Sequence, residues 1–160
     1  MIKLNKPRVF RETPNVRFLD ITIPKANGLD LVEHTGRSVS PPDRNKNKCW
    51  YCHQYQTDNN RVIKGQRLFE LFYLEWEDPH WFVFLDEESG ALEIPPGCMH
   101  RSYSGVRGSL LLNHAVRLPQ YDETKEFIPC VTSHPSEFSP RYHGITRYSA
   151  DFFIKHGRLP

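Results

Sequence analysis

The sequence lacks several features that would assign it to a class at once. No apolar run approaches the roughly 18 residues that a membrane span requires. The first residues contain no hydrophobic segment of the secretory type, so we expect no secretory signal. The net charge is only +2, without a dense Lys/Arg tract, which argues against a nucleic-acid partner. We therefore expect a cytoplasmic protein that binds neither membranes nor nucleic acid.

Cysteine is also scarce and poorly arranged for a metal or disulfide framework. The four cysteines are Cys49, Cys52, Cys98 and Cys130, and no second Cys/His pair with matching spacing completes a zinc site. In a reducing compartment they are expected to be thiols. A chain of 160 residues can bury a core without such staples. We expect one domain over 1–160, with its core at about 16–118 and a C-terminal arm at about 119–160.

What the chain does have is a strong β pattern with an aromatic content of 12%. Short segments of strand character are separated by Gly, Pro, Asn and Asp, as in a barrel or sandwich of short strands. From Pro119 onward prolines recur, and Ser149 can cap a short helix over Ala150–His156 that ends at Gly157. The prediction is an all-β barrel with a helical or extended C-terminal arm, its strands at 16–23, 29–33, 49–55, 61–64, 66–76, 81–85, 91–94 and 108–116.

Two polar clusters interrupt this apolar pattern. In the first, Tyr51, His53 and Tyr55 recur at every second residue, which projects three polar rings onto one face of a strand. In the second, the turn Pro95-Pro96-Gly97 bends the chain sharply and is followed by His100. A row of polar rings inside a barrel is costly unless it lines a pocket, so the pattern predicts a pocket marked by both histidines.

These clusters carry a resemblance to a known superfamily. Pro95-x-Gly97-x-x-His100 resembles the second cupin motif, and Trp50 to Asp58 followed by Gly65 resembles the first. The pieces Gln56-Thr57-Asp58, Ile94 to His100 and Tyr121-Asp122 are similar to those of cupins related to the dTDP-4-dehydrorhamnose 3,5-epimerases and dTDP-sugar ketoisomerases. The likeness covers about residues 48–122.

The resemblance implies a cupin jelly-roll barrel, commonly a homodimer, that binds a nucleotide-linked sugar without a cofactor. It implies that His53 removes a proton next to a ketone and that His100 belongs to the same catalytic site. Histidine suits this chemistry because its ordinary pKa lies near neutral pH. Such a reaction also needs donors for the enolate oxygen and for phosphate. Candidates for substrate binding are Tyr51, Tyr55, Arg61, Arg67, Asn113 and His114.

Two other functions remain open from the sequence. One is a non-catalytic cupin that binds a sugar or another small molecule. The other is a metal-dependent cupin oxygenase, in which His53 and His100 would hold a divalent metal weakly, with Asp58 or His114 as a third ligand. Metal-binding cupins supply His-x-His and then Glu before the last His. Here the first pair reads His53-x-Tyr55, and the Glu position falls near Asn59 or Asn60.

Overall fold

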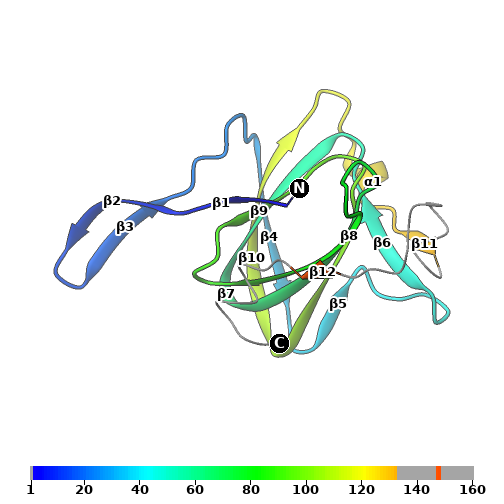
Figure 1. Cartoon of the computed structure of the whole chain (residues 1–160), viewed down its shortest axis with the longest axis horizontal. Coiled ribbons are helices and arrows are strands. Elements are labelled where there is room, and N and C mark those ends of the chain that lie inside the picture. The colour runs from blue at the N-terminus through cyan, green and yellow to red at the C-terminus, as the bar shows by residue number, and fades with distance from the viewer. Residues whose placement is uncertain (1, 133–146, 149–160) are drawn as a thin grey trace.

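The computed structural model describes residues 2–132 and 147–148, and almost all of their regular structure is β-strand (Figure 1). In the described residues none of the helical structure has the length or apolar character needed to cross a bilayer. The elements are β1 (Lys3–Asn5), β2 (Arg8–Thr13), β3 (Val16–Asp20), β4 (Gly28–His34), β5 (Ser38–Ser40), β6 (Lys48–Cys52), β7 (Gln56–Phe72), β8 (His80–Asp86), β9 (Ala91–Ile94), β10 (Met99–Arg117), α1 (Glu123–Glu126), β11 (Cys130–Thr132) and β12 (Arg147–Tyr148).

Two long strands, β7 and β10, pair antiparallel with each other and run through both layers of a jelly roll. Near the start of β7 and the end of β10, the neighbouring strands are β9 and β4. Near the end of β7 and the start of β10, the neighbours are β8, β5 and β6. The two layers therefore share their central strands, which confirms the predicted cupin jelly-roll barrel.

Glycines mark the place where the two long strands change layer. Gly65 and Gly108 have φ of +81° and +70°, a left-handed conformation that suits glycine. A Cβ on Gly108 would lie 2.2 Å from the carbonyl oxygen of His34, so only glycine permits this approach. The pairing register shifts here, and each strand exchanges its inward and outward faces: even-numbered residues of β7 point inward before Gly65, and odd-numbered residues point inward after it.

The apolar core fills the space between the layers. Its largest cluster includes Phe69, Leu71, Leu92 and Leu111, each with an exposed fraction of 3% or less. Trp50, Phe72 and Met99 form a second cluster on the other face of the layer that contains β6. Toward the first residues of β7 and the last residues of β10, the buried side chains are polar instead of apolar. These polar side chains form part of the site described below.

The N-terminal segment differs from the prediction. Residues 16–23 were expected to be a barrel strand, but β3 ends at Asp20, and among the described residues it pairs with β2 alone. The β2–β3 hairpin extends away from the barrel in Figure 1, whereas β1 joins the barrel through β9. The hairpin exposes apolar side chains, with Phe10 at 56% and Val16 at 48%.

Other boundaries also differ from the expected ones. The strand predicted at 49–55 ends at Cys52, and the strands predicted at 61–64 and 66–76 form a single strand that ends at Phe72. The strand predicted at 108–116 begins at Met99. Pairing with β10 continues past Gly65 because the register shift accommodates the glycine instead of ending the strand. The predicted arm begins with α1 and β11, while the helix predicted at 150–156 lies outside the described residues.

Candidate active site

A cavity of about 270 Å³ lies between the two layers, at the end where polar residues replace the apolar core. Its walls come from β4, β5, β6, β7 and β10, from the residue after β6 and from the segment that follows α1. Both motif histidines face it. The lining residues are Asp30, Val32, Ser40, Tyr51, His53, Asp58, Asn60, Arg67, Phe69, His100, Ser102, Leu111, Asn113 and Phe127.

His53 and His100 are oriented by backbone carbonyl groups. Nδ1 of His53 lies 2.9 Å from the carbonyl oxygen of Glu126, and Nδ1 of His100 lies 3.2 Å from that of Cys98. A carbonyl oxygen can only accept a hydrogen bond, so each Nδ1 carries the hydrogen. In the neutral rings each Nε2 is then unprotonated and carries a lone pair. The two ring centroids are 5.0 Å apart.

Asp58 lies between the two rings. Its Oδ2 is 3.5 Å from Nε2 of His53 and 3.5 Å from Nε2 of His100. Its other oxygen accepts hydrogen bonds from Gln56 Nε2 at 2.6 Å and Asn113 Nδ2 at 2.9 Å. The Gln56-Thr57-Asp58 motif thus has a physical role, because Gln56 orients the carboxylate that faces both histidines.

The centre of this cluster is a site of converging acceptors. With neutral rings, two nitrogen lone pairs and one carboxylate oxygen point into the same small space and no hydrogen lies between them. Burial lowers the pKa of His100 well below its ordinary value, more than the charge of Asp58 raises it, so that this ring is neutral at pH 7. The cluster is therefore ready to receive a proton or another positively polarised atom.

The same three side chains can hold a divalent cation. The ligand atoms of His53, Asp58 and His100 all lie within 4.8 Å of one another. Ligands about 2.1 Å from a tetrahedral metal lie roughly 3.4 Å apart, which is close to both nitrogen–oxygen distances. The donor set thus fits a metal that prefers imidazole and carboxylate ligands.

The segment after the last barrel strand closes over His53. Asp122 caps α1 by accepting a hydrogen bond from the Thr124 N–H, and this short helix delivers Glu126. The Glu126 carboxylate accepts the backbone N–H groups of Gln54 and Tyr55 at 2.7 and 3.1 Å. Sequence reasoning missed Glu126, because no local pattern shows that a carboxylate after a strand will be buried against a loop about 70 residues away.

Phe127 completes the cover. Its ring meets the ring of His53 edge-on at 4.9 Å and that of Tyr51 at 6.0 Å. Tyr51 in turn stacks on His53 at 6.0 Å. Its hydroxyl makes no hydrogen bond to any described residue, so it is available to a ligand in the cavity.

The predicted site residues divide into two groups. His53, His100, Tyr51, Arg67 and Asn113 all line the cavity. Asn113 is already engaged, since its amide donates to Asp58 and its oxygen accepts the backbone N–H of Asn59 at 2.8 Å.

Tyr55, Arg61 and His114 do not line the cavity. Tyr55 was expected to share a face with His53, but β6 ends at Cys52 and the tyrosine side chain is 42% exposed. Arg61 lies on the outward face of β7 before the register shift, opposite Leu112. His114 lies on the outward face of β10, opposite Leu29, so it cannot supply the third metal ligand.

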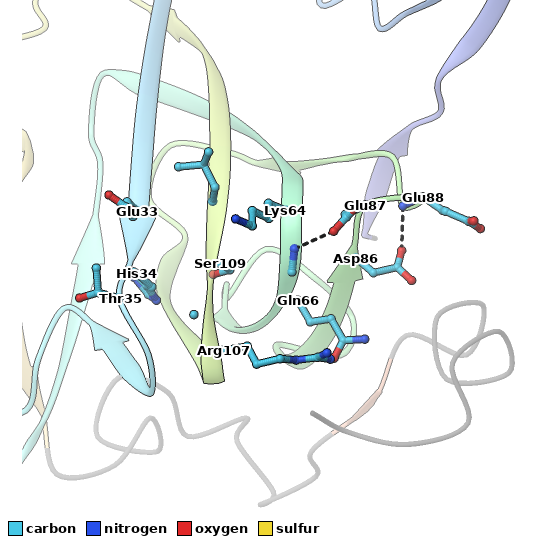
Figure 2. A pocket seen from close by; sticks show the side chains of 13 residues that line it. Glu33, His34, Thr35, Lys64, Gln66, Asp86, Glu87, Glu88, Arg107 and Ser109 are labelled. Carbon is cyan, nitrogen blue, oxygen red and sulfur yellow. Dashed lines mark hydrogen bonds between the residues drawn. The ribbon is translucent and has the colours of Figure 1, made fainter. Parts of the chain in front are cut away.

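A second, larger hollow of about 700 Å³ shares none of these lining residues. Figure 2 shows its wall of charged and polar side chains from β4, β7, β10 and the turn after β8. Glu87 there accepts the Gly65 N–H at 2.9 Å, and the Asp86 carboxylate accepts the N–H of Glu88 at 3.1 Å. Those two carboxylates accept hydrogen bonds from nearby backbone N–H groups. The residues that line the hollow include no histidine pair like that of the smaller cavity.

Several solved structures share this fold. QdtA, a sugar 3,4-ketoisomerase from Thermoanaerobacterium thermosaccharolyticum solved with TDP, is 18% identical, with a TM-score of 0.56, over 79% of this chain and 86% of that chain. A dTDP sugar isomerase from Desulfovibrio desulfuricans G20 is 17% identical, with a TM-score of 0.58, over 88% and 89%. A dTDP-4-dehydrorhamnose 3,5-epimerase from Elizabethkingia anophelis is 11% identical, with a TM-score of 0.57, over 77% and 72%.

No protein-family model and no curated protein sequence matches the chain. At these identities the structural matches establish a shared fold. They confirm that the chain folds as a cupin of the kind found in dTDP-sugar isomerases and epimerases, as the two motifs indicated.

Proposed function

We propose that this protein is an epimerase or ketoisomerase that acts on a nucleotide-linked keto-sugar by removing a proton next to the ketone. One observation carries the proposal: the Nε2 atoms of His53 and His100 and a carboxylate oxygen of Asp58 converge, without a hydrogen between them, in a buried cavity. Such a cluster favours uptake of a proton from a bound molecule.

His53 is the proposed base. As the carbon–hydrogen bond next to the ketone breaks, the proton moves to Nε2 of His53 and the electron pair shifts to the ketone oxygen as an enolate. The cationic ring that forms is stabilised by two buried carboxylates, Asp58 at 3.5 Å from Nε2 and Glu126 at 3.7 Å from Nδ1. Return of a proton to the same carbon from the opposite face gives the epimer. Addition of the proton to the former ketone carbon gives the isomeric ketone, once the neighbouring hydroxyl has passed its own proton to the former ketone oxygen.

The enolate oxygen needs a hydrogen-bond donor. Tyr51 is the proposed donor, since its ring stacks on that of His53 and its hydroxyl has no partner among the described residues. No bound cofactor is needed for these steps. His100 is neutral at pH 7 and acts as a second acceptor beside the reacting carbon.

Solved relatives in fold support a nucleotide-linked substrate. QdtA has been solved with TDP, and a His→Asn variant of it has been solved with TDP-4-keto-6-deoxyglucose. The cavity, at about 270 Å³, is smaller than the pockets of roughly 300–1,000 Å³ that drug-sized ligands fill, so we expect it to take the sugar rather than the whole sugar nucleotide. The nucleotide is therefore expected outside the cavity, at its mouth.

We also propose a homodimer. The β2–β3 hairpin is isolated from the barrel, and two-stranded hairpins are marginal in water unless another surface covers them. The outward face of β4 also exposes Leu29 at 66% and Leu31 at 63%. Sedimentation equilibrium of the full chain tests this, and a monomer at micromolar concentration would contradict it.

We assign the protein to the cytoplasm, since its four cysteines are unpaired.

Exchange of solvent deuterium into the sugar tests the proposed reaction. The probes are thymidine-diphosphate 4-keto sugars, beginning with TDP-4-keto-6-deoxyglucose. We expect deuterium next to the ketone, and a rate that falls about 100- to 10,000-fold in His53→Asn while the sugar nucleotide still binds. The matched control is His114→Asn, which changes a histidine on the outward face of β10.

Each other outcome identifies a different function. Binding without deuterium exchange indicates a non-catalytic sugar-binding cupin, and failure to bind any of these nucleotides contradicts the proposal. The metal-dependent alternative is tested by elemental analysis of the purified protein. Stoichiometric iron, nickel or manganese that is lost in His100→Ala would favour it, because the three facing ligands fit a cation.

A further inference from the structure

Arg67 is a buried cation that has no counter-ion among the described residues. Its side chain is 1% exposed, and its guanidinium donates only to uncharged oxygens: Ser109 Oγ at 3.0 Å, the Ser109 carbonyl at 3.3 Å and the Val32 carbonyl at 3.3 Å. No carboxylate of the described residues pairs with it. Its Nη1 atom donates no hydrogen bond to any described residue. Burial lowers the pKa of Arg67 only to about 10, so the side chain is charged at pH 7.

The cavity offers Arg67 no internal partner. Asp58 is already held by Gln56 and Asn113 between the two imidazoles. Asp30, the other carboxylate in the wall, pairs with Arg117 at 2.7 Å. Buried arginines are normally paired, because an isolated charge in an apolar setting is costly.

The surroundings of Arg67 would strengthen a bond to an anion. Val32, Phe69 and Leu111 line the same cavity, so a charge pair formed there is little screened by water. A guanidinium also matches a carboxylate with two parallel hydrogen bonds. Because the cavity of about 270 Å³ is small for a whole sugar nucleotide, we expect the anion that reaches Arg67 to belong to the sugar.

We propose that Arg67 binds a carboxylate on the sugar, so that the substrate class is a nucleotide-linked sugar acid. This inference rests on the proposed function for the identity of the ligand. It assigns Arg67 the role of a specificity residue: a sugar with a methyl or hydroxymethyl group at that position leaves the guanidinium unpaired, whereas a carboxylate supplies its counter-ion.

Calorimetric titration with a matched pair of ligands tests the inference. TDP-glucuronic acid and TDP-glucose differ only in a carboxylate in place of a hydroxymethyl group. We expect the acid to bind about tenfold or more tightly to the unchanged protein. Arg67→Met, which keeps most of the side-chain volume, should abolish this preference, and Arg67→Lys should retain part of it. Gln66→Met, on the neighbouring outward-facing residue, is the control and should leave the preference intact.

The other possible binding results distinguish failure of the carboxylate inference from failure of the proposed function. Equal binding of the two sugar nucleotides, or a preference that survives in Arg67→Met, overturns the carboxylate inference and leaves the proposed function standing. Arg67-dependent binding of TDP alone assigns the anion to the diphosphate and also overturns it. If no nucleotide binds but free glucuronate binds in an Arg67-dependent way, the proposed function fails and the carboxylate site stands. If none of these ligands binds, both are wrong.

Discussion

The strands β7 and β10 contribute to two buried polar clusters, one on each face of a layer, and the two clusters differ in how completely their atoms are paired. On the face away from the cavity, Glu70 accepts hydrogen bonds from His80 at 3.0 Å, from Lys48 at 3.0 and 3.2 Å and from the Tyr103 hydroxyl. Each of these contacts joins a donor to an acceptor. In the cavity, by contrast, Nε2 of His53 and Nε2 of His100 face Oδ2 of Asp58, and all three atoms are hydrogen-bond acceptors when the rings are neutral.

This difference separates a structural acid from a functional one. Burial by itself would raise the pKa of Glu70, but the hydrogen bonds from His80 and Tyr103 and the charge of Lys48 outweigh it and lower the pKa to about 2. A buried network that is complete stabilises the fold and needs nothing further. Unpaired buried groups such as those around Asp58 and the cation Arg67 are costly, and a bound molecule removes that cost.

Asp58→Asn should give the largest effect on activity. The substitution removes the charge that stabilises the protonated ring of His53, so we expect deuterium exchange to fall about 100-fold or more. The new amide N–H can face the imidazole lone pairs, so the free energy of unfolding should stay the same or rise. Exchange rates and sugar-nucleotide binding, measured on the same samples, check the role of Asp58, because a catalytic loss lowers the rate while binding persists. A lowered unfolding free energy with an unchanged exchange rate in the folded fraction would make Asp58 structural.

Glu70→Gln should have the opposite signature. Breaking a buried charged network costs about 3–5 kcal/mol, so the urea midpoint should fall while the folded fraction exchanges deuterium at the normal rate. The folded-state pKa of Glu70 lies below its ordinary value of 4.5, so its stabilisation is present above pH 4.5 and is lost as the pH falls toward about 2. The variant should therefore lose less stability on acidification. Normal stability with lost exchange would reverse the comparison.

Tyr51→Phe should have an intermediate effect. If the Tyr51 hydroxyl donates to the enolate oxygen, its removal should lower the exchange rate about 10- to 100-fold with little change in sugar-nucleotide binding. Tyr73→Phe is the control, since Tyr73 packs beside Trp76 at 5.3 Å and does not line the cavity. An exchange rate in Tyr51→Phe equal to that of the unchanged protein would exclude the tyrosine as donor.

Much of the fold could be predicted from the sequence because its signals are local. Alternating apolar residues and Gly/Pro punctuation mark most of the barrel strands, and the turn at Pro95-Pro96-Gly97 lies where two strands meet. The same motifs brought His53 and His100 to one cavity. The register shift at Gly65 is different, because a glycine inside a strand pattern is compatible with a break or with a bulge.

That one ambiguity decides which arginine faces the cavity. Strict alternation along β7 would put Arg61 and Arg67 on the same face, since both are odd-numbered. The shift between them turns Arg67 inward and leaves Arg61 outside. Glu126 could not be predicted for a different reason. Its carboxylate is held by the backbone N–H of Gln54, which is far away in the chain.

The smallest predicted effect concerns His34, which lies near Arg67 and is 7% exposed. Burial, together with the charge of Arg67, lowers its pKa to about 4, and its Nδ1 lies 3.1 Å from Ser104 Oγ. Between pH 6.5 and about 4 the unfolded chain binds a proton there that the folded chain does not, so stability falls as the pH falls. His34→Gln should reduce this loss by about 1 kcal/mol, allowing for screening by solvent. Urea unfolding at pH 7 and pH 5 measures it. An equal loss in both proteins would show that His34 does not contribute, and that burial of His100, which has a lowered pKa in the same direction, accounts for the acid sensitivity.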